Sequence, residues 1–306
     1  MIYTLTLNPA IDYVVKTTDF LPGELNRLDD EQIYFGGKGI NVSRILKELG
    51  MNTVALGFVA GFTGDAIKDG VEEMGINTDF VVLKDGNTRI NVKIKAETET
   101  ELNGRGPRVG NADKEALFEK LRTLKDGDML VLSGSVPAGL GSNVYEEIME
   151  SLSGKKIDII VDTTGESLLN SLKQKPFLIK PNKEELEQIF ERKLNTDAEI
   201  VSCAKELCKL GAKRTLVSMG AQGAVYIDAD ESVYKVTAPS GKALNTVGAG
   251  DSMVAGFLAG YSSGKDIGET LKTASAAGSA TAFSDDLATK EAVMNLLDKI
   301  SVEEIG

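Results

Sequence analysis

Short runs of apolar and β-branched residues recur along most of the chain, and stretches with helical periodicity separate them. The apolar runs occupy residues 53–61, 129–135, 158–162, 177–182 and 215–220. Because they do not alternate with polar residues, they predict strands that are buried on both faces. Helical patterns lie at 39–50, 111–124, 142–152, 166–173 and 183–191, and the last third reads as further helices at 248–264, 267–283 and 289–300.

This alternation predicts an α/β fold with three layers, in which a mostly parallel central sheet carries helices on both faces. Ligands of such sheets bind at the carboxyl ends of the strands. The hairpin-like segment 223–236, with its turn near residues 228–231, is assigned to the edge of this main domain.

Two stretches, residues 11–36 and 88–106, depart from the pattern. Within them apolar and polar side chains alternate, with Ile90, Val92, Ile94 and Ala96 on one face, as is typical of antiparallel strands with one solvated face. They predict a small β-sheet lid over the main domain, which would comprise residues 1–10, 37–87 and 107–306. One face of this lid could pair with a second subunit, which makes a homodimer possible.

The composition limits the functions that the chain can have. Its 306 residues, 42% of them hydrophobic, suffice for a large core, and a formal net charge of −12 argues against broad binding of nucleic acid. A bound anion must therefore meet a local cluster of cations. No basic start with a long apolar run, and no stretch of membrane-spanning length, occurs, so a cytoplasmic protein without membrane attachment is expected.

The chain has two cysteines, Cys203 and Cys208, and no histidine. This composition supports neither a disulfide framework nor a zinc site. Without histidine a Ser-His-Asp catalytic triad is impossible, so any proton transfer near neutral pH must use carboxylates, lysines or water.

The stretch "NTVGAGDSMVAGF", residues 245–257, contains the best candidate for such a carboxylate. Gly248, Ala249 and Gly250 leave the backbone N–H groups of a helix start uncovered, which is a favourable site for an anion. Asp251 follows at once and could accept a proton from an attacking hydroxyl. A carboxylate there could also be a plain helix cap or first-turn residue.

A second Gly-rich helix start, "FGGKGINVSRILKELG", begins at residue 35. Gly36 and Gly37 precede Lys38, a cation, and Asn41, which can both donate and accept hydrogen bonds. The stretch is not a Walker A loop, and no such loop occurs in the chain.

Two further motifs follow predicted strands. In "KPNKEELE", Asn182 can cap the next helix and Glu185, in an N-x-x-E spacing, could organise Mg²⁺ through water, although an acidic first turn is the simpler interpretation. In "SMGAQGA", Ser218, Gly220 and Gly223 form a turn that a flat or phosphorylated ligand could approach closely.

The ordered set "LTLNPAID", "GGKGINVSRILKELG", "TRINVKI", "SGSVPAG", "KPNKEELE", "SMGAQGA" and "NTVGAGDS" resembles the ribokinase-like (PfkB) carbohydrate kinases across essentially the whole chain. Within that family the chain is most similar to the 1-phosphofructokinases, with the tagatose-6-phosphate kinases close behind. The resemblance implies the ribokinase-like fold and the use of ATP and Mg²⁺.

The resemblance also implies roles for individual residues. Asp251 matches the base that activates the sugar hydroxyl, and Ala249 and Gly250 match the backbone that stabilises charge on the γ-phosphoryl group. The remaining matches are Asp12, Gly36, Gly37 and Asn41 for the sugar, Glu185 for Mg²⁺, and Lys180, Asn182, Ser218, Gly220, Gly223 and Gly250 for the nucleotide.

A phosphorylated sugar needs cations near the lid, and Arg27, Lys38 and Arg89 are the candidates. Asn103 is a further candidate for substrate contact. It begins "NGRGP", in which Arg105 stands where relatives have proline, so that the loop is either more mobile or gains a phosphate contact.

The function expected from the resemblance is transfer of a phosphoryl group from ATP to the 6-hydroxyl of D-fructose 1-phosphate. Tagatose-6-phosphate kinase and 6-phosphofructokinase activities are the alternatives within the family, and a sugar-phosphate-binding regulator without catalysis is the alternative outside it. A dinucleotide-dependent oxidoreductase is disfavoured, because no G-x-G-x-x-G follows the first strand.

Overall fold

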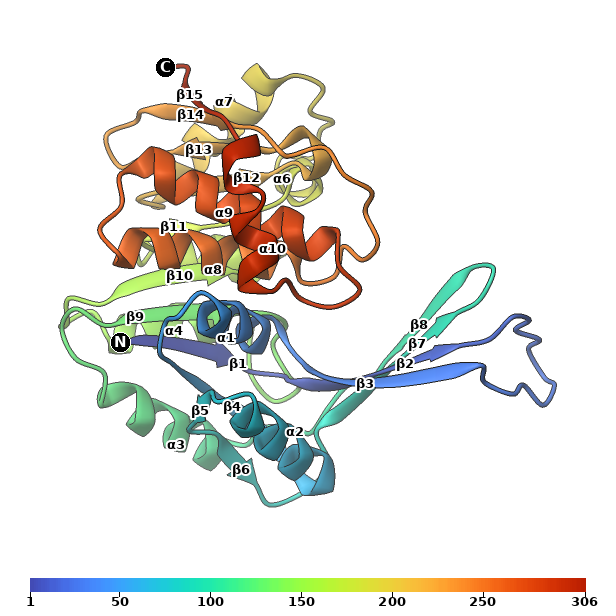
Figure 1. Ribbon diagram of the computed structural model, residues 1–306. Coiled ribbons are helices and arrows are strands. Elements are labelled where there is room, and N and C mark those ends of the chain that lie inside the picture. Colours follow the sequence, from blue (N-terminus) through green and yellow to red (C-terminus); the bar gives the residue numbers. More distant parts are fainter.

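The computed structural model, which describes residues 1–306, contains one large sheet and one small sheet (Figure 1). The large sheet has eleven strands. Its centre is a parallel set made of β4 (Thr53–Ala60), β1 (Ile2–Thr6), β9 (Met129–Ser133), β10 (Asp158–Asp162), β11 (Leu178–Ile179) and β12 (Thr215–Ser218). The runs predicted as buried strands all lie in this set, as expected for strands covered on both faces.

Short strands form both edges of the large sheet. On one side, antiparallel pairing continues through β13 (Ala224–Ile227), β14 (Val233–Val236) and β15 (Val302–Glu304). On the other side, β5 (Asn77–Thr78) and β6 (Val81–Leu83) both pair with β4. The hairpin predicted at the edge of the main domain is β13–β14.

Helices cover both faces of the large sheet, which confirms the three-layer α/β prediction (Figure 1). One core lies under α3 (Asn111–Arg122), α4 (Val144–Ser151), α5 (Gly165–Leu172), α6 (Lys183–Ile189) and α7 (Asp197–Leu210). The opposite core lies under α1 (Lys38–Glu48), α8 (Ala249–Ser262), α9 (Ile267–Ala282) and α10 (Lys290–Met294). A third cluster joins α1 to α2 (Gly61–Glu73). No helix is both long and apolar enough to span a bilayer.

The small sheet consists of β3 (Asp30–Gly36), β2 (Ala10–Lys16), β7 (Arg89–Lys95) and β8 (Glu99–Asn103), in that order. It extends as an arm from the main body and comes from two separate excursions of the chain (Figure 1). The outer pairs β2–β3 and β7–β8 are antiparallel, as predicted, whereas the central pair β2–β7 is parallel. Both central strands run outward from the main body, and this shared direction explains why they pair in parallel.

Some elements of the large sheet were not predicted. Strand β1 lies at its centre and β15 closes its edge, yet neither is among the strands expected from the sequence. Strand β15 has three residues, too few for a periodic pattern.

Candidate active site

The start of α8 is a backbone site for an anion. Gly248, before the helix, has φ +80°, a left-handed conformation that favours glycine, and a Cβ there would lie 2.5 Å from Leu287 Cδ2. Neither Gly248 nor any other side chain caps the helix, and the first turn carries Asp251. The glycine therefore serves both the turn and the packing against Leu287. Ala249 N donates to Thr246 O at 3.3 Å, whereas the N–H groups of Gly250 and Asp251 have no partner in the chain.

Asp251 is a buried carboxylate, with 5% of its surface exposed. Its Oδ2 accepts a hydrogen bond of 2.8 Å from Asn41 Nδ2 on α1. Burial, together with the negative charge of Asp162, raises the pKa of Asp251 to about 6. The carboxylate is thus ionised at neutral pH but is a better proton acceptor than an exposed aspartate, which suits a general base.

Asp162, at the carboxyl end of β10, holds two cations near Asp251. Its Oδ1 lies 3.2 Å from Lys38 Nζ and 3.4 Å from Lys180 Nζ. Burial alone would raise the pKa of Asp162, but Lys180 and Lys38 more than offset this effect and lower the pKa. A Cβ on Gly250 would lie 3.0 Å from Lys180 Nζ, so this ammonium group lies beside the start of α8.

Asn182 and Glu185 form a capping box at the start of α6. Asn182 Oδ1 accepts from Glu185 N at 2.7 Å, and Glu185 Oε2 accepts from Asn182 N at 2.9 Å. The predicted cap is confirmed. Glu185 Oε1 accepts no hydrogen bond, and Asp162 Oδ2 is buried without a partner. Lys38 feels the charges of both carboxylates, and two free hard oxygen atoms in one neighbourhood fit the chemistry of Mg²⁺.

A cavity of about 540 Å³ lies on the far side of the α8 start. No charged side chain lines it, and its wall includes Ser218, Gly220, Gly223, Ala249 and Gly250. Asn182 pairs with Ser218 through a backbone bridge, so the "KPN" and "SMG" turns lie next to each other at the sheet edge. The structure thus brings together the residues predicted for the nucleotide.

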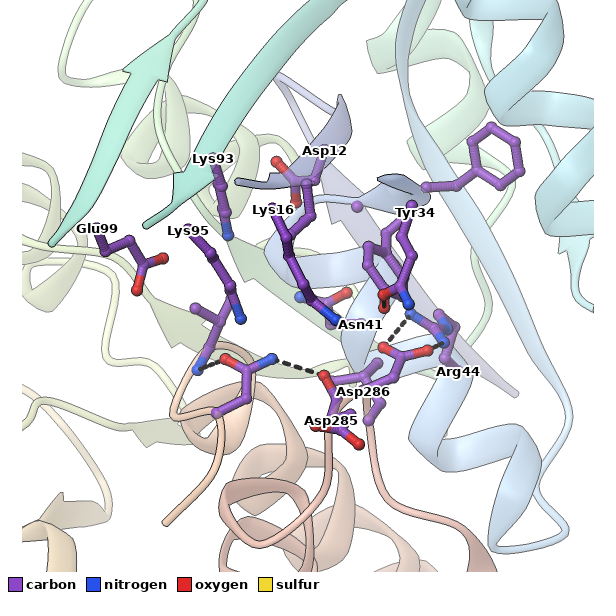
Figure 2. Close-up of a pocket in the computed structure, with 17 residues that line it drawn as sticks. Asp12, Lys16, Tyr34, Asn41, Arg44, Lys93, Lys95, Glu99, Asp285 and Asp286 are labelled. Carbon is purple, nitrogen blue, oxygen red and sulfur yellow. Dashed lines mark hydrogen bonds and ion pairs between the residues drawn. The ribbon is translucent and has the colours of Figure 1, made fainter. Parts of the chain in front are cut away.

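A second cavity, of about 200 Å³, lies between the lid and the main domain (Figure 2). Asp12, Gly36 and Asn41 line it, as expected for a sugar site. Asp12 accepts from Asn91 Nδ2 at 2.8 Å, and a Cβ on Gly36 would lie 2.7 Å from Asp12 Oδ2. Gly36 therefore leaves room for the carboxylate of Asp12.

Gly37 makes the entry to α1 possible. Its φ is +129°, and a Cβ there would lie 2.5 Å from Thr6 Cγ2. Only glycine satisfies both conditions, and the turn places Lys38 at the first position of the helix.

The lining of the lid cavity does not include Arg27, Lys38, Arg89 or Asn103. Arg27 is exposed in the loop between β2 and β3, and Lys38 is paired with Asp162 near Asp251. Arg89 is half-buried on β7, where its Nε donates to Asn8 O at 3.1 Å, and Asn103 is exposed on β8. The lining contains other cations, Lys16, Arg44, Lys93 and Lys95.

Comparison with known proteins identifies the family. The model of the pfkB family carbohydrate kinases matches residues 3–291. The chain belongs to this family. It is 45% identical over 305 residues to the 1-phosphofructokinase of Bacillus subtilis, with 100% of each chain covered, and 42% identical to the D-tagatose-1-phosphate kinase of Bacillus licheniformis, with 94% of each covered. Phosphofructokinase-2 from Escherichia coli in complex with fructose-6-phosphate has a similar structure, with a TM-score of 0.90, 29% identity and coverage of 97% of this chain and 98% of that one.

The family identifies the protein as a carbohydrate kinase that uses ATP. Three features of this kinase had escaped sequence analysis: Asp162, Asn91 and the lysines of the lid cavity. Asp162 had a detectable signal, because it ends a predicted strand at the carboxyl edge, where ligands bind. The lysines had none, since alternating lysines on a lid strand are equally typical of a solvated face.

Proposed function

We propose that this kinase transfers the γ-phosphoryl group of ATP to the 6-hydroxyl of D-fructose 1-phosphate and forms fructose 1,6-bisphosphate. One observation carries the proposal. The start of α8 lies between the two cavities, because Ala249 and Gly250 line one of them while Asp251 is hydrogen-bonded to Asn41, which lines the other. The 45% identity to a 1-phosphofructokinase supports the choice of sugar phosphate.

In this mechanism Asp251 accepts the proton of the 6-hydroxyl as its oxygen attacks phosphorus. The bond between O6 and the γ-phosphorus forms, the bond to the β-phosphate oxygen breaks, and ADP leaves. Asn41 holds the carboxylate in place through its amide. Backbone N–H groups at Gly248, Ala249 and Gly250 stabilise the charge on the transferred group.

Lys38 and Lys180 add positive charge on the same side. Asp162 fixes both ammonium groups, so they need no reorganisation when the phosphates arrive. Glu185, acting through water, and Asp162 are the residues that would hold Mg²⁺. Bound there, the ion would neutralise charge on the phosphate oxygens.

The remaining assignments follow from the cavities and the family. Ser218, Gly220 and Gly223, together with Asn182, shape the nucleotide side. Asp12, Gly36, Gly37 and Asn41 bind the sugar hydroxyls, and Arg89, which lies beside Asp12, is a candidate for a phosphate contact. Arg27 and Asn103 remain predictions, and neither reaches the cavity of its own chain.

D-Tagatose 1-phosphate is the second candidate substrate, since a D-tagatose-1-phosphate kinase is 42% identical to the chain. It differs from fructose 1-phosphate only in the configuration at C4. Both compounds would present the 6-hydroxyl to Asp251.

Steady-state kinetics test the proposal. We expect kcat/KM for fructose 1-phosphate, measured with ATP and Mg²⁺, to exceed that for tagatose 1-phosphate, tagatose 6-phosphate and fructose 6-phosphate by at least about tenfold, the factor that about 1.4 kcal/mol confers. A higher value for any of the other three would reassign the substrate. Binding of sugar phosphate without ATP turnover would identify a regulator instead.

We also propose that the lid mediates a homodimer. Strand alternation puts Ile33, Ile90 and Leu102 on the face opposite the cavity, where 60%, 42% and 57% of their surfaces are exposed. Three large apolar side chains on one face of a protruding sheet suit a self-complementary interface. Light scattering after size exclusion tests this, with a monomer expected for Ile33→Glu and a dimer for the parent. A monomeric parent would refute it.

A further inference from the structure

Asn91 is a buried amide on β7, at the base of the lid, and both of its polar atoms are hydrogen-bonded. Only 8% of its surface is exposed. Its Nδ2 donates to Asp12 Oδ1 at 2.8 Å, and its Oδ1 accepts from Gly104 N at 3.2 Å. A backbone N–H can only donate and an ionised carboxylate can only accept, so one orientation of the amide serves both partners. The side chain therefore joins the carboxylate on β2 to the segment that follows β8.

The two carboxylate oxygens of Asp12 have different surroundings. Asp12 is paired with Asn91 in the β2–β7 register and lines the lid cavity. Its Oδ1 accepts from Asn91, whereas its Oδ2 accepts no hydrogen bond from the chain. Gly36 leaves space beside Oδ2, since a Cβ on this glycine would lie 2.7 Å from that oxygen. One oxygen is thus held by the lid and the other is free for a ligand.

The base of β7 is fastened to the main domain. Thr88 directly precedes the strand, its Oγ1 accepts from Ala60 N at 2.8 Å, and its carbonyl oxygen accepts from Thr63 Oγ1 at 2.8 Å. These bonds join it to the end of β4 and the start of α2. Asn91 follows shortly after this anchor and is therefore held relative to the main domain, whereas the tip of the lid extends away from it (Figure 1).

The segment that follows β8 is held as well. Gly104 N donates to Asn91, and one residue further on Arg105 O accepts from Asn8 Nδ2 at 3.2 Å. A Cβ on Gly104 would lie 2.7 Å from Ile90 O, so the segment runs close against β7. The amide of Asn91 thus has a fixed backbone partner on one side, and it can impose a fixed orientation on the carboxylate on its other side.

Packing does not explain an asparagine at this position. Asn is depleted in strands, and burial of its amide costs free energy unless each polar atom is hydrogen-bonded. An apolar residue at position 91 would avoid that cost, but it would leave Asp12 Oδ1 without a donor. The residue is therefore explained by the carboxylate that it holds.

We propose that Asn91 is a positioning residue for substrate binding: by holding Oδ1 of Asp12, it directs Oδ2 toward a hydroxyl of the ketohexose phosphate. This inference rests on the proposed function, in which Asp12 binds the sugar, and it adds the residue that orients the carboxylate. An acceptor that is already oriented needs no rearrangement when the ligand arrives. Loss of the amide should therefore weaken sugar binding and leave the chemical step intact.

Two substitutions test the amide. We expect Asn91→Ala to raise KM for fructose 1-phosphate about tenfold, as for loss of a hydrogen bond to a charged group. The kcat and the KM for ATP should stay within about twofold, because Asn91 contacts neither Asp251 nor the nucleotide cavity. Asn91→Asp keeps the shape and the acceptor for Gly104 N but places a second carboxylate against Asp12, so KM should rise further. Asn52→Ala, at an exposed asparagine of the main domain, is the control and should match the parent.

A double-mutant cycle separates positioning from a structural role. Asn91→Ala should raise KM about tenfold in the parent but less than about twofold in an Asp12→Ala background, because the carboxylate that it orients is gone. The same factor in both backgrounds would show a structural role and overturn the inference. So would a KM that stays within about twofold in both Asn91 variants, or a fall in kcat at unchanged KM.

Two further measurements support the cycle. Titration calorimetry with fructose 1-phosphate gives the same factors as changes in Kd where turnover is slow. Thermal unfolding shows whether each variant is folded. If Asn91→Ala does not fold, Asn91→Ser, whose shorter side chain does not reach Asp12, replaces it in the cycle.

The parent protein separates this inference from the proposed function. If the parent phosphorylates fructose 1-phosphate and the two substitutions act independently, only the role of Asn91 is wrong. If the parent prefers one of the other three sugar phosphates, the cycle is measured with that substrate and decides the role of Asn91 there. If the parent neither phosphorylates nor binds any of the four, the proposed function fails and the inference fails with it.

Discussion

The main sheet and the lid are built from strands of similar length, but they differ in what covers them. Strands such as β9 are buried at every residue under helices on both faces. Strand β8 has no buried residue, and the lid has no helix over its outer face (Figure 1). Burial of apolar surface is the main stabilising contribution in a fold, so most of the stability belongs to the main domain.

The groups proposed for function are also divided between the main domain and the lid. The proposed base Asp251, the Asp162 cluster and the start of α8 lie in the main domain, where burial shifts pKa values and fixes geometry. The lid contributes the buried Asn91 and the half-buried Asp12, Lys93 and Lys95. The rigid region therefore holds the chemistry, and the open region holds the groups that would recognise the substrate.

The largest expected effect concerns Asp251. Asp251→Asn keeps the shape and the neighbouring Asn41 but removes the basicity, so we expect kcat to fall by about 10²–10⁴ while KM for the sugar phosphate changes little. Steady-state kinetics check this, with Asp298→Asn on the surface as the control. Near-normal kcat would show that the base is elsewhere and would undo the division between the two regions.

Core and lid should differ in their contribution to stability. Leu56→Ala in β4 removes a side chain that is 1% exposed and should cost about 2–5 kcal/mol of the free energy of unfolding. Ile33→Ala in β3, at 60% exposure, should cost less than about 0.5 kcal/mol at a protein concentration low enough to favour the monomer. Urea unfolding measures both. Similar losses would mean that the lid is part of the cooperative core.

Asp251 should also destabilise the main domain at neutral pH. Its pKa is raised from 3.8 to about 6 on folding, so the folded state holds the proton more tightly, and stability is lost as the pH rises from about 4 through about 6. Above that pH the ionised group costs about 2–3 kcal/mol. Asp251→Asn should accordingly be more stable than the parent at pH 8 and lose most of that advantage near pH 4, as measured by urea unfolding at each pH.

The smallest effect is the pH dependence of catalysis. Because the base must be ionised, we expect kcat/KM to fall about tenfold per pH unit below about pH 6. Removal of the negative charge in Asp162→Asn lowers the pKa of Asp251, so the fall in kcat/KM should begin at a lower pH in this variant. If the fall begins at the same pH in Asp162→Asn as in the parent, another group controls it.

The periodic patterns and short motifs of the sequence were sufficient for much of this architecture. Non-alternating apolar runs identified the buried parallel strands, and the glycines of "GGKG" and "GAGD" identified the two helix starts beside the cavities. These features are local, because strand or helix periodicity and the need for glycine at a tight turn depend on neighbours in the chain.

The tertiary structure alone decided which distant groups meet. It paired β2 with β7 in parallel, joined Lys38 and Lys180 through Asp162, and put Lys93 and Lys95 rather than Arg27 against the cavity under the lid. The sequence could not determine this, because the charge of a side chain is visible in the sequence but its partner depends on how the strands cross. A lysine on a lid strand is an ordinary surface residue until the fold closes a cavity around it.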